Sequence, residues 1–202
     1  AVDIIAFGDS ITQGWPYVTR PRNGLRAGGY EPKLEALFSG AGHSARVLNY
    51  GIAGETTAQG VRRIDTVLRR TNAEYILILE GTNDANIGVS PQTIISNLRF
   101  MIDRARAYGV EPILATLTPD ERLSFKNIST GLNPAIRELA IQKKVMLCDQ
   151  YDAVIGWNWS VDGLHPNNTG YQLIAQAWFD ILRLFFDPII ALQAYNGQYI
   201  VA

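Results

Sequence analysis

Ser10, Asp162 and His165 are the residues of this chain whose types and spacing could support nucleophilic catalysis. A serine hydroxyl becomes a nucleophile when a base takes its proton and a carboxylate orients that base. His165 follows Asp162 by three residues with Gly163 between them, so a turn could bring the carboxylate to the imidazole Nδ1. Ordinary roles are the alternative, because Gly8-Asp9-Ser10 is also a turn or helix-cap signal, and the acid and the histidine could be turn and helix-entry residues.

Acyl transfer also needs hydrogen-bond donors for the developing oxyanion. Gly54 and Asn83 are candidates, because each lies in a turn that follows a predicted strand. A glycine lets a backbone N–H approach a ligand without a Cβ in the way, and an asparagine amide can donate to the same oxygen. Both could equally be plain turn residues. The second histidine, His43, lies in a short glycine-rich connection and is expected to be a solvated loop residue.

Apolar runs and helical spacing predict the elements that would hold these residues. Five strands are predicted, at 4–7, 46–50, 75–79, 110–117 and 145–149. Helical segments follow them in alternation, which predicts an α/β fold with a parallel sheet and helices on both faces. Ser10 would then lie just past the carboxyl end of the first strand. That edge of an open parallel sheet is where ligands bind.

Three predictions concern individual helices. In the helix after Thr56-Thr57, four arginines are expected to face water: Arg62, Arg63, Arg69 and Arg70. Asn133-Pro134 is expected to begin the helix before the fifth strand. The last helix is expected to bury its apolar positions, from Tyr171 to Phe185. The tail from 193 to 202 has no predicted structure.

The composition predicts one globular domain over residues 1–202, with 47% hydrophobic and 18% charged residues. Lys and Arg (18) nearly balance Asp and Glu (19), so no net field favours nucleic acid as a partner. A single cysteine, Cys148, cannot form an intrachain disulfide. No apolar run reaches the roughly 18 residues of a membrane span, and the chain starts without Met or a leader. A soluble protein is expected, cytoplasmic or secreted after removal of a signal.

Four short segments follow predicted strands or precede the last helix. They are Gly8-Asp9-Ser10-Ile11-Thr12, Gly51-Ile52-Ala53-Gly54-Glu55-Thr56-Thr57, Gly81-Thr82-Asn83-Asp84 and Asp162-Gly163-Leu164-His165-Pro166. In this order they resemble the four motif blocks of the SGNH hydrolases, the GDSL-type esterases and lipases. Ile11-Thr12 stands where many members have Leu-Ser, which weakens assignment to a named lipase subgroup.

The resemblance implies Ser10 as nucleophile, His165 as base and Asp162 as the acid that orients it. It implies an oxyanion hole formed by the N–H of Ser10, the N–H of Gly54 and the side chain of Asn83. It also implies a three-layer flavodoxin-like fold with five parallel strands in the order 2-1-3-4-5. The expected function is hydrolysis of carboxylic esters through an acyl-enzyme, without a metal or another cofactor.

The expected substrate is a small-molecule ester with a short acyl group. Trp15, Trp157 and Trp159 lie in loops near the predicted site, and flat aromatic rings beside polar groups suit aryl or sugar alcohols. An acetylated carbohydrate is therefore one alternative substrate, and lysophospholipase or thioesterase activity is another. The tryptophans could instead be core residues. A different class is a non-catalytic binding domain with the same fold. The sequence predicts no particular oligomeric state.

Overall fold

The computed structural model describes residues 1–122 and 128–186. Its centre is a five-stranded parallel sheet, and the strand order β2-β1-β3-β4-β5 confirms the predicted one. The strands are β1 (Val2–Gly8), β2 (Ala45–Gly51), β3 (Tyr75–Leu79), β4 (Glu111–Ala115) and β5 (Met146–Cys148). A strand covered on both faces needs apolar side chains at successive positions. Strand β3 in the middle meets this need, because Ile76, Leu77 and Ile78 are fully buried.

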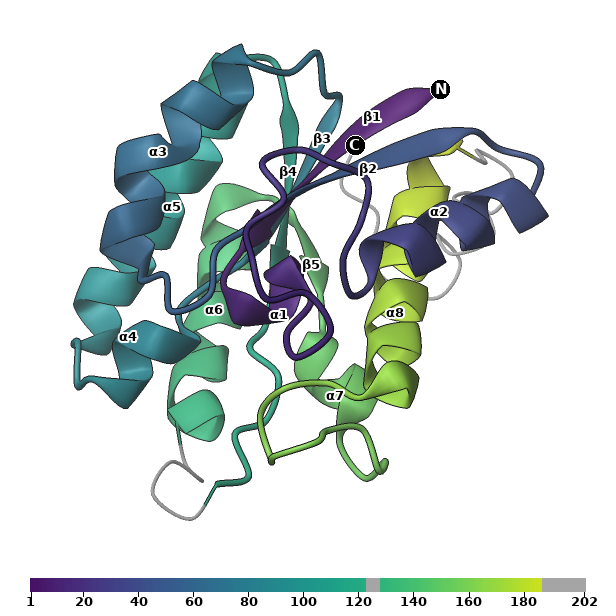
Figure 1. Ribbon diagram of the computed structural model, residues 1–202. Helices are drawn as coiled ribbons and strands as arrows, with labels where there is room; N and C mark the ends of the chain where they lie inside the picture. The colour runs from purple at the N-terminus through teal and green to yellow at the C-terminus, as the bar shows by residue number, and fades with distance from the viewer. Residues whose placement is uncertain (123–127, 187–202) are drawn as a thin grey trace, which may run out of the picture.

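Helices cover both faces of the sheet and give the fold three layers (Figure 1). Helices α2 (Glu31–Gly40) and α8 (Asn168–Phe186) pack on one face, while α3 (Thr57–Arg69), α5 (Pro91–Ala107) and α6 (Ile128–Lys143) pack on the other. Three short helices each follow a strand: α1 (Ser10–Gln13), α4 (Thr82–Asn86) and α7 (Gln150–Val154). Within the described residues, no helix is long and apolar enough to cross a membrane.

The register of the central strands brings three turns to one edge of the sheet. Gly8 at the end of β1 pairs with Gly51 of β2 and with Leu79 of β3. Because these strands are parallel, the residues that follow them meet at their common carboxyl edge. A side chain at Gly8 would not fit, since its Cβ would lie 2.4 Å from both the Leu79 carbonyl oxygen and Thr12 Oγ1. The lack of a side chain at Gly8 therefore lets α1 lie close to the end of β3.

Several predicted helix details differ from the structure. Helix α6 begins at Ile128 and contains Pro134, so Asn133 is not its cap. The Asn133 side chain instead bonds both the N–H and the carbonyl oxygen of Leu117 (2.8 and 2.9 Å). Phe185 is 41% exposed rather than buried, because it lies at the end of α8 and packs on Tyr75 at the start of β3. Residues 123–127 and the tail from 193 lie outside the described residues.

Candidate active site

Ser10 lies in the sharp turn between β1 and the short helix α1. Asp9 caps this helix, because its carboxylate accepts a hydrogen bond from the N–H of Ile11 (3.0 Å). Ser10 is then the first residue of the helix, where a backbone N–H has no partner within the helix. Its Oγ lies 3.1 Å from His165 Nε2. The turn therefore presents a hydroxyl, a backbone N–H and a contacting imidazole at one point.

His165 and Asp162 form a compact turn just before α8. The imidazole Nδ1 lies 2.7 Å from Asp162 Oδ2, and the other carboxylate oxygen accepts the N–H groups of His165 (2.7 Å) and Leu164 (3.0 Å). Partial burial acts to raise the pKa of Asp162, but these hydrogen bonds outweigh it and the pKa is lowered from its usual value. The carboxylate therefore stays ionised and holds the ring with Nε2 toward Ser10.

Two further contacts fix the position of this turn. Ser160 and Pro166 form an isolated antiparallel bridge, and the N–H of Val161 donates to the carbonyl oxygen of His165 (2.8 Å). The N–H of Glu121, from the segment after β4, donates to the carbonyl oxygen of Gly163 (2.7 Å). The turn is thus closed on itself and tied to the neighbouring strand connection.

Gly54 and Asn83 lie in the turns after β2 and β3, as the register requires. Gly54 is exposed, in the left-handed conformation (φ +80°), and a Cβ built on it would meet nothing within 4 Å. The preceding N–H, of Ala53, donates to Gln13 Oε1 of α1 (2.9 Å). Asn83 Nδ2 donates to the carbonyl oxygen of Glu55 (2.8 Å) and lies 3.5 Å from Asp9 Oδ2. An amide nitrogen has two donor hydrogens, so the short bond to Glu55 uses one of them.

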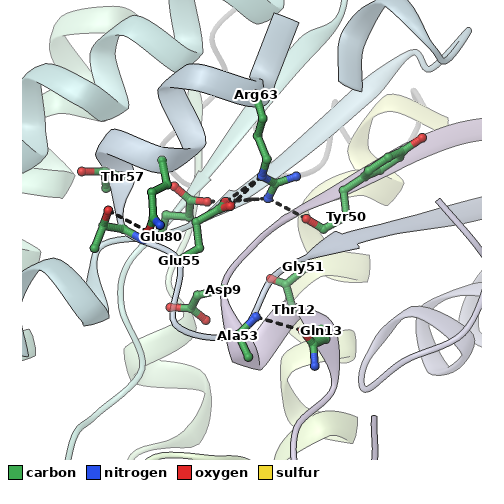
Figure 2. A network of polar contacts seen from close by, with 12 residues as sticks. Asp9, Thr12, Gln13, Tyr50, Gly51, Ala53, Glu55, Thr57, Arg63 and Glu80 are labelled. Carbon is green, nitrogen blue, oxygen red and sulfur yellow. Dashed lines mark hydrogen bonds and ion pairs between the residues drawn. The ribbon is translucent and has the colours of Figure 1, made fainter. Parts of the chain in front are cut away.

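A group of charged side chains with little exposure to solvent lies around the connection between β2 and α3 (Figure 2). Its members are Asp9, Glu55, Glu80 and Arg63. For Arg63, the prediction of a water-facing side chain is wrong. The guanidinium lies 3.9 Å from the centre of the Phe7 ring and pairs with Glu55. Asp9 is also buried, and burial raises its pKa to about 7, with smaller contributions from the carboxylates of Glu55 and Asp84. The sequence pattern indicated neither the burial of Arg63 nor its partner.

The three tryptophans predicted to bind substrate have different environments. The Trp15 ring is 37% exposed and approaches the His165 ring edge-on, with centroids 6.1 Å apart. Trp157 is 60% exposed on the loop that leads to Asp162. Trp159 is 1% exposed, so the prediction that it contacts substrate is wrong. Its side chain belongs to the hydrophobic core, and its carbonyl oxygen accepts the N–H of Asn167 just before α8.

Two further points concern the second histidine, His43, and possible metal ligands. His43 lies just before the amino end of β2, at the opposite edge of the sheet from Ser10, with its ring against Phe186 (5.4 Å). Among residues 1–122 and 128–186, no group of three or more His, Cys, Asp or Glu is arranged to hold a metal ion. The candidate site therefore consists of a serine, a histidine, an aspartate and the two donor turns.

The order of these residues along the chain matches a family model. The model of the GDSL-like Lipase/Acylhydrolase family matches residues 6–173, which is most of the chain. The chain belongs to this family. Its membership accounts for the presence of the four motif blocks at the carboxyl edge of one parallel sheet.

Known relatives of this family member differ in how much of their length they share with it. The uncharacterized lipoprotein YqeF of Bacillus subtilis is 34% identical over 125 residues, which cover 58% of this chain and 49% of YqeF. The chain thus matches about half the length of that relative. Esterase TesA of Pseudomonas aeruginosa is 25% identical over 169 residues, covering 82% of this chain and 80% of TesA. The solved structure of Axe2, an acetyl xylan esterase from Geobacillus stearothermophilus, has the same fold, with a TM-score of 0.78 and 18% identity. The match covers 90% of this chain and 94% of Axe2.

Proposed function

We propose that this chain hydrolyses carboxylic esters through an acyl-enzyme formed on Ser10. The observation that carries the proposal is the continuous line of contacts from Ser10 Oγ to His165 Nε2 (3.1 Å) and from His165 Nδ1 to Asp162 Oδ2 (2.7 Å). A serine hydroxyl within hydrogen-bond reach of an imidazole that a carboxylate orients is the arrangement used for acyl transfer on several unrelated folds.

The proposed reaction has two halves. In the first, Nε2 of neutral His165 takes the Ser10 proton as Oγ attacks the carbonyl carbon, and the same proton then passes to the leaving alcohol. In the second, His165 takes a proton from water, the hydroxide attacks the acyl-enzyme, and Ser10 recovers its proton as the acid leaves. Asp162 stays ionised throughout and stabilises the imidazolium that forms in each half. Its lowered pKa supports this role.

The proposed oxyanion donors are the N–H of Ser10, the N–H of Gly54 and the amide of Asn83. Three features support them. Ser10 is the first residue of a helix, Gly54 has open space beside its backbone, and Asn83 lies in a turn that contacts both Asp9 and Glu55. Donors fixed before the reaction stabilise the developing charge without reorganisation, which is commonly the largest contribution to rate.

For the substrate we propose a short acyl ester of an aryl or sugar alcohol. Trp15 beside His165 offers a flat, partly exposed ring within reach of the leaving alcohol, and Trp157 offers a second one on the neighbouring loop. The acetyl xylan esterase of the same fold makes an acetylated carbohydrate a specific candidate. Lysophospholipase and thioesterase activity remain alternatives that the same chemistry permits.

A panel of p-nitrophenyl esters from acetate to palmitate, run beside acetylated xylose and xylan, tests this substrate class. We expect kcat/KM to peak at acetate to butyrate and to fall beyond about C8, because the loop sequences around Ser10 mix aromatic with polar residues rather than offering a continuous aliphatic surface. In a long aliphatic groove, each buried CH₂ would instead add up to ~0.8 kcal/mol. Highest activity on palmitate would favour a lipase or lysophospholipase. A folded protein without activity on any ester would favour a binding domain.

A further inference from the structure

One largely buried ion pair lies beside the proposed donor turns, with the side chains of Arg63 and Glu55 19% and 3% exposed. Arg63 Nε donates to both carboxylate oxygens of Glu55 (2.9 and 2.7 Å), and Nη2 donates to Oε1 (2.5 Å). Nη2 also donates to the carbonyl oxygen of Tyr50 near the end of β2 (2.7 Å). One guanidinium from α3 therefore holds both ends of the β2–α3 connection, as Figure 2 shows.

Glu55 connects this ion pair to both donor turns. Its N–H and that of Gly54 belong to the same tight turn, which closes with a bond from Glu55 N to the carbonyl oxygen of Ile52 (3.1 Å). Its own carbonyl oxygen accepts the hydrogen bond from Asn83 Nδ2 (2.8 Å). A movement of the Glu55 backbone would therefore displace Gly54 and Asn83 together.

The charges around Arg63 explain why Glu55 stays in place. Glu80 is fully buried, and its nearer oxygen lies 4.0 Å from Arg63 Nη2. Burial, and then the nearby Glu55, raise the pKa of Glu80 well above its usual value. Glu55, whose carboxylate oxygens lie 2.5 to 2.9 Å from the guanidinium nitrogens, is therefore the partner that Arg63 holds directly.

We propose that Arg63 is a positioning residue that sets the two oxyanion donors, Gly54 and Asn83, through its ion pair with Glu55. This inference rests on the proposed function. Without the guanidinium, the Glu55 carboxylate would be a buried charge without a counterion, and it would have to turn toward water or take up a proton. Either change releases the turn that carries Gly54 and the carbonyl that holds Asn83.

Arg63→Met tests the inference, with Arg104→Met as its matched control. Arg104 also pairs through Nε and Nη2 with a carboxylate of α3, that of Asp65, and it also lies over an aromatic ring, that of Tyr108, but on the outside of the α3–α5 pair. We expect Arg63→Met to lower kcat by about 10- to 100-fold with little change in KM, because small misplacements of groups that act in the transition state have effects of this size. Arg104→Met should keep kcat within about 3-fold of wild type, as a surface ion pair does little.

Two further variants separate positioning from a general loss of structure. Arg63→Lys keeps the positive charge but loses the fork that reaches Glu55 and the Tyr50 carbonyl together, so we expect its kcat to lie between those of Arg63→Met and wild type. In the Asn83→Ala background, Arg63→Met should cost much less than in wild type, because two changes that act on one unit are not additive. Fully multiplicative losses would overturn the inference, and so would equal kcat values for Arg63→Met and Arg104→Met.

Should Arg63→Met fail to fold, as judged by circular dichroism, Glu55→Gln replaces it, since this variant removes the charge and keeps the carbonyl that holds Asn83. We expect a smaller kcat loss of about 3- to 10-fold with unchanged KM, and an unchanged kcat would overturn the inference. Wild-type labelling of Ser10 by a fluorophosphonate distinguishes the two levels of failure. An unlabelled wild type contradicts the proposed function, whereas a labelled wild type with a fully active Arg63→Met contradicts this inference alone.

Discussion

Ser10 lies between two polar regions that differ in solvent exposure and in the number of turns that form them. On one side, Asp162 and His165 come from a single turn, and the Asp162 side chain is 44% exposed. On the other side, Gly54 and Asn83 come from two turns and are backed by buried carboxyl groups. The pKa of Asp162 is lowered, mainly by hydrogen bonds that outweigh its partial burial, whereas burial raises the pKa of Asp9 to about 7.

The two aspartates differ in how far hydrogen bonds offset the loss of water around the carboxylate. Asp162 keeps its charge because three hydrogen bonds replace the water it has lost. Asp9 accepts bonds from the N–H of Ile11 and from Asn83 but forms no ion pair within residues 1–122 and 128–186, and burial dominates. Changes in the first region should therefore affect proton transfer alone, while changes in the second should couple activity to stability.

The largest expected effect is on the proposed catalytic residues. Ser10→Ala and His165→Ala should each lower kcat by about 10⁴-fold or more, and Asp162→Ala somewhat less, because such residues act as one unit. Thermal unfolding should change little, since the three form a local turn and one contact. His43→Ala serves as the control and should keep wild-type kcat. Loss of activity in His43→Ala with full activity in His165→Ala would reverse the assignment of the base.

A pair of tryptophan variants tests whether the buried Trp159 and the exposed Trp157, in the loop before Asp162, have different roles. Trp159→Ala should lower the free energy of unfolding by about 3–5 kcal/mol, because it leaves a large cavity under α8. Trp157→Ala should change it by no more than about 0.5 kcal/mol and should instead alter the ratio of kcat/KM for aryl and sugar acetates. Urea unfolding measures the first quantity and the ester panel the second. Equal destabilisation by both variants would contradict the assignment of Trp157 to the surface.

In the buried region, Asn83→Ala should reduce kcat by about 10²- to 10³-fold, which corresponds to ~3–4 kcal/mol, with KM little changed. The reason is that the amide is expected to bond the oxyanion, which exists only in the transition state. Steady-state kinetics on p-nitrophenyl acetate separate the two parameters. A loss seen mainly in KM would place Asn83 in ground-state binding instead.

The smallest expected effect concerns Asp9 and pH. Its folded pKa of about 7 lies above an unfolded value of about 3.9, so between these values only the folded state keeps the proton. Asp9 therefore lowers stability progressively as pH rises from about 4 to 7. Asp9→Asn keeps an acceptor for the N–H of Ile11 and should match wild-type stability at pH 4 but exceed it by ~1–3 kcal/mol at pH 8. The same stability difference at both pH values would contradict the raised pKa.

Much of this architecture follows from local patterns in the sequence. The five strands are apolar runs flanked by glycine or polar turns, and their carboxyl ends carry the serine, glycine and asparagine. Asp162 and His165 are recognisable because their contact needs only three residues of chain. Helices α4 and α7 are missed because five residues are too few for a helical repeat to appear.

What the sequence could not predict depends on contacts between distant segments. Arg63 lies three residues after Gly60 and four before Val67, on the side that α3 buries, but nothing in the sequence pattern indicates Glu55 as its partner. Trp157 and Trp159 are only two residues apart. Trp159 is buried in the hydrophobic core, whereas Trp157 is exposed to solvent. Asn133-Pro134 has the pattern of a helix start, but the asparagine is used to hold the backbone of Leu117.

Intact-protein mass spectrometry after treatment with a fluorophosphonate tests the central claim most directly. The wild type should gain one organophosphoryl group, and peptide mapping should place it on Ser10. Ser10→Ala should gain none, and His165→Ala should react far more slowly because its serine keeps the proton. A folded wild type that stays unlabelled, or one that carries the label on another residue, would contradict the assignment of Ser10 as the nucleophile.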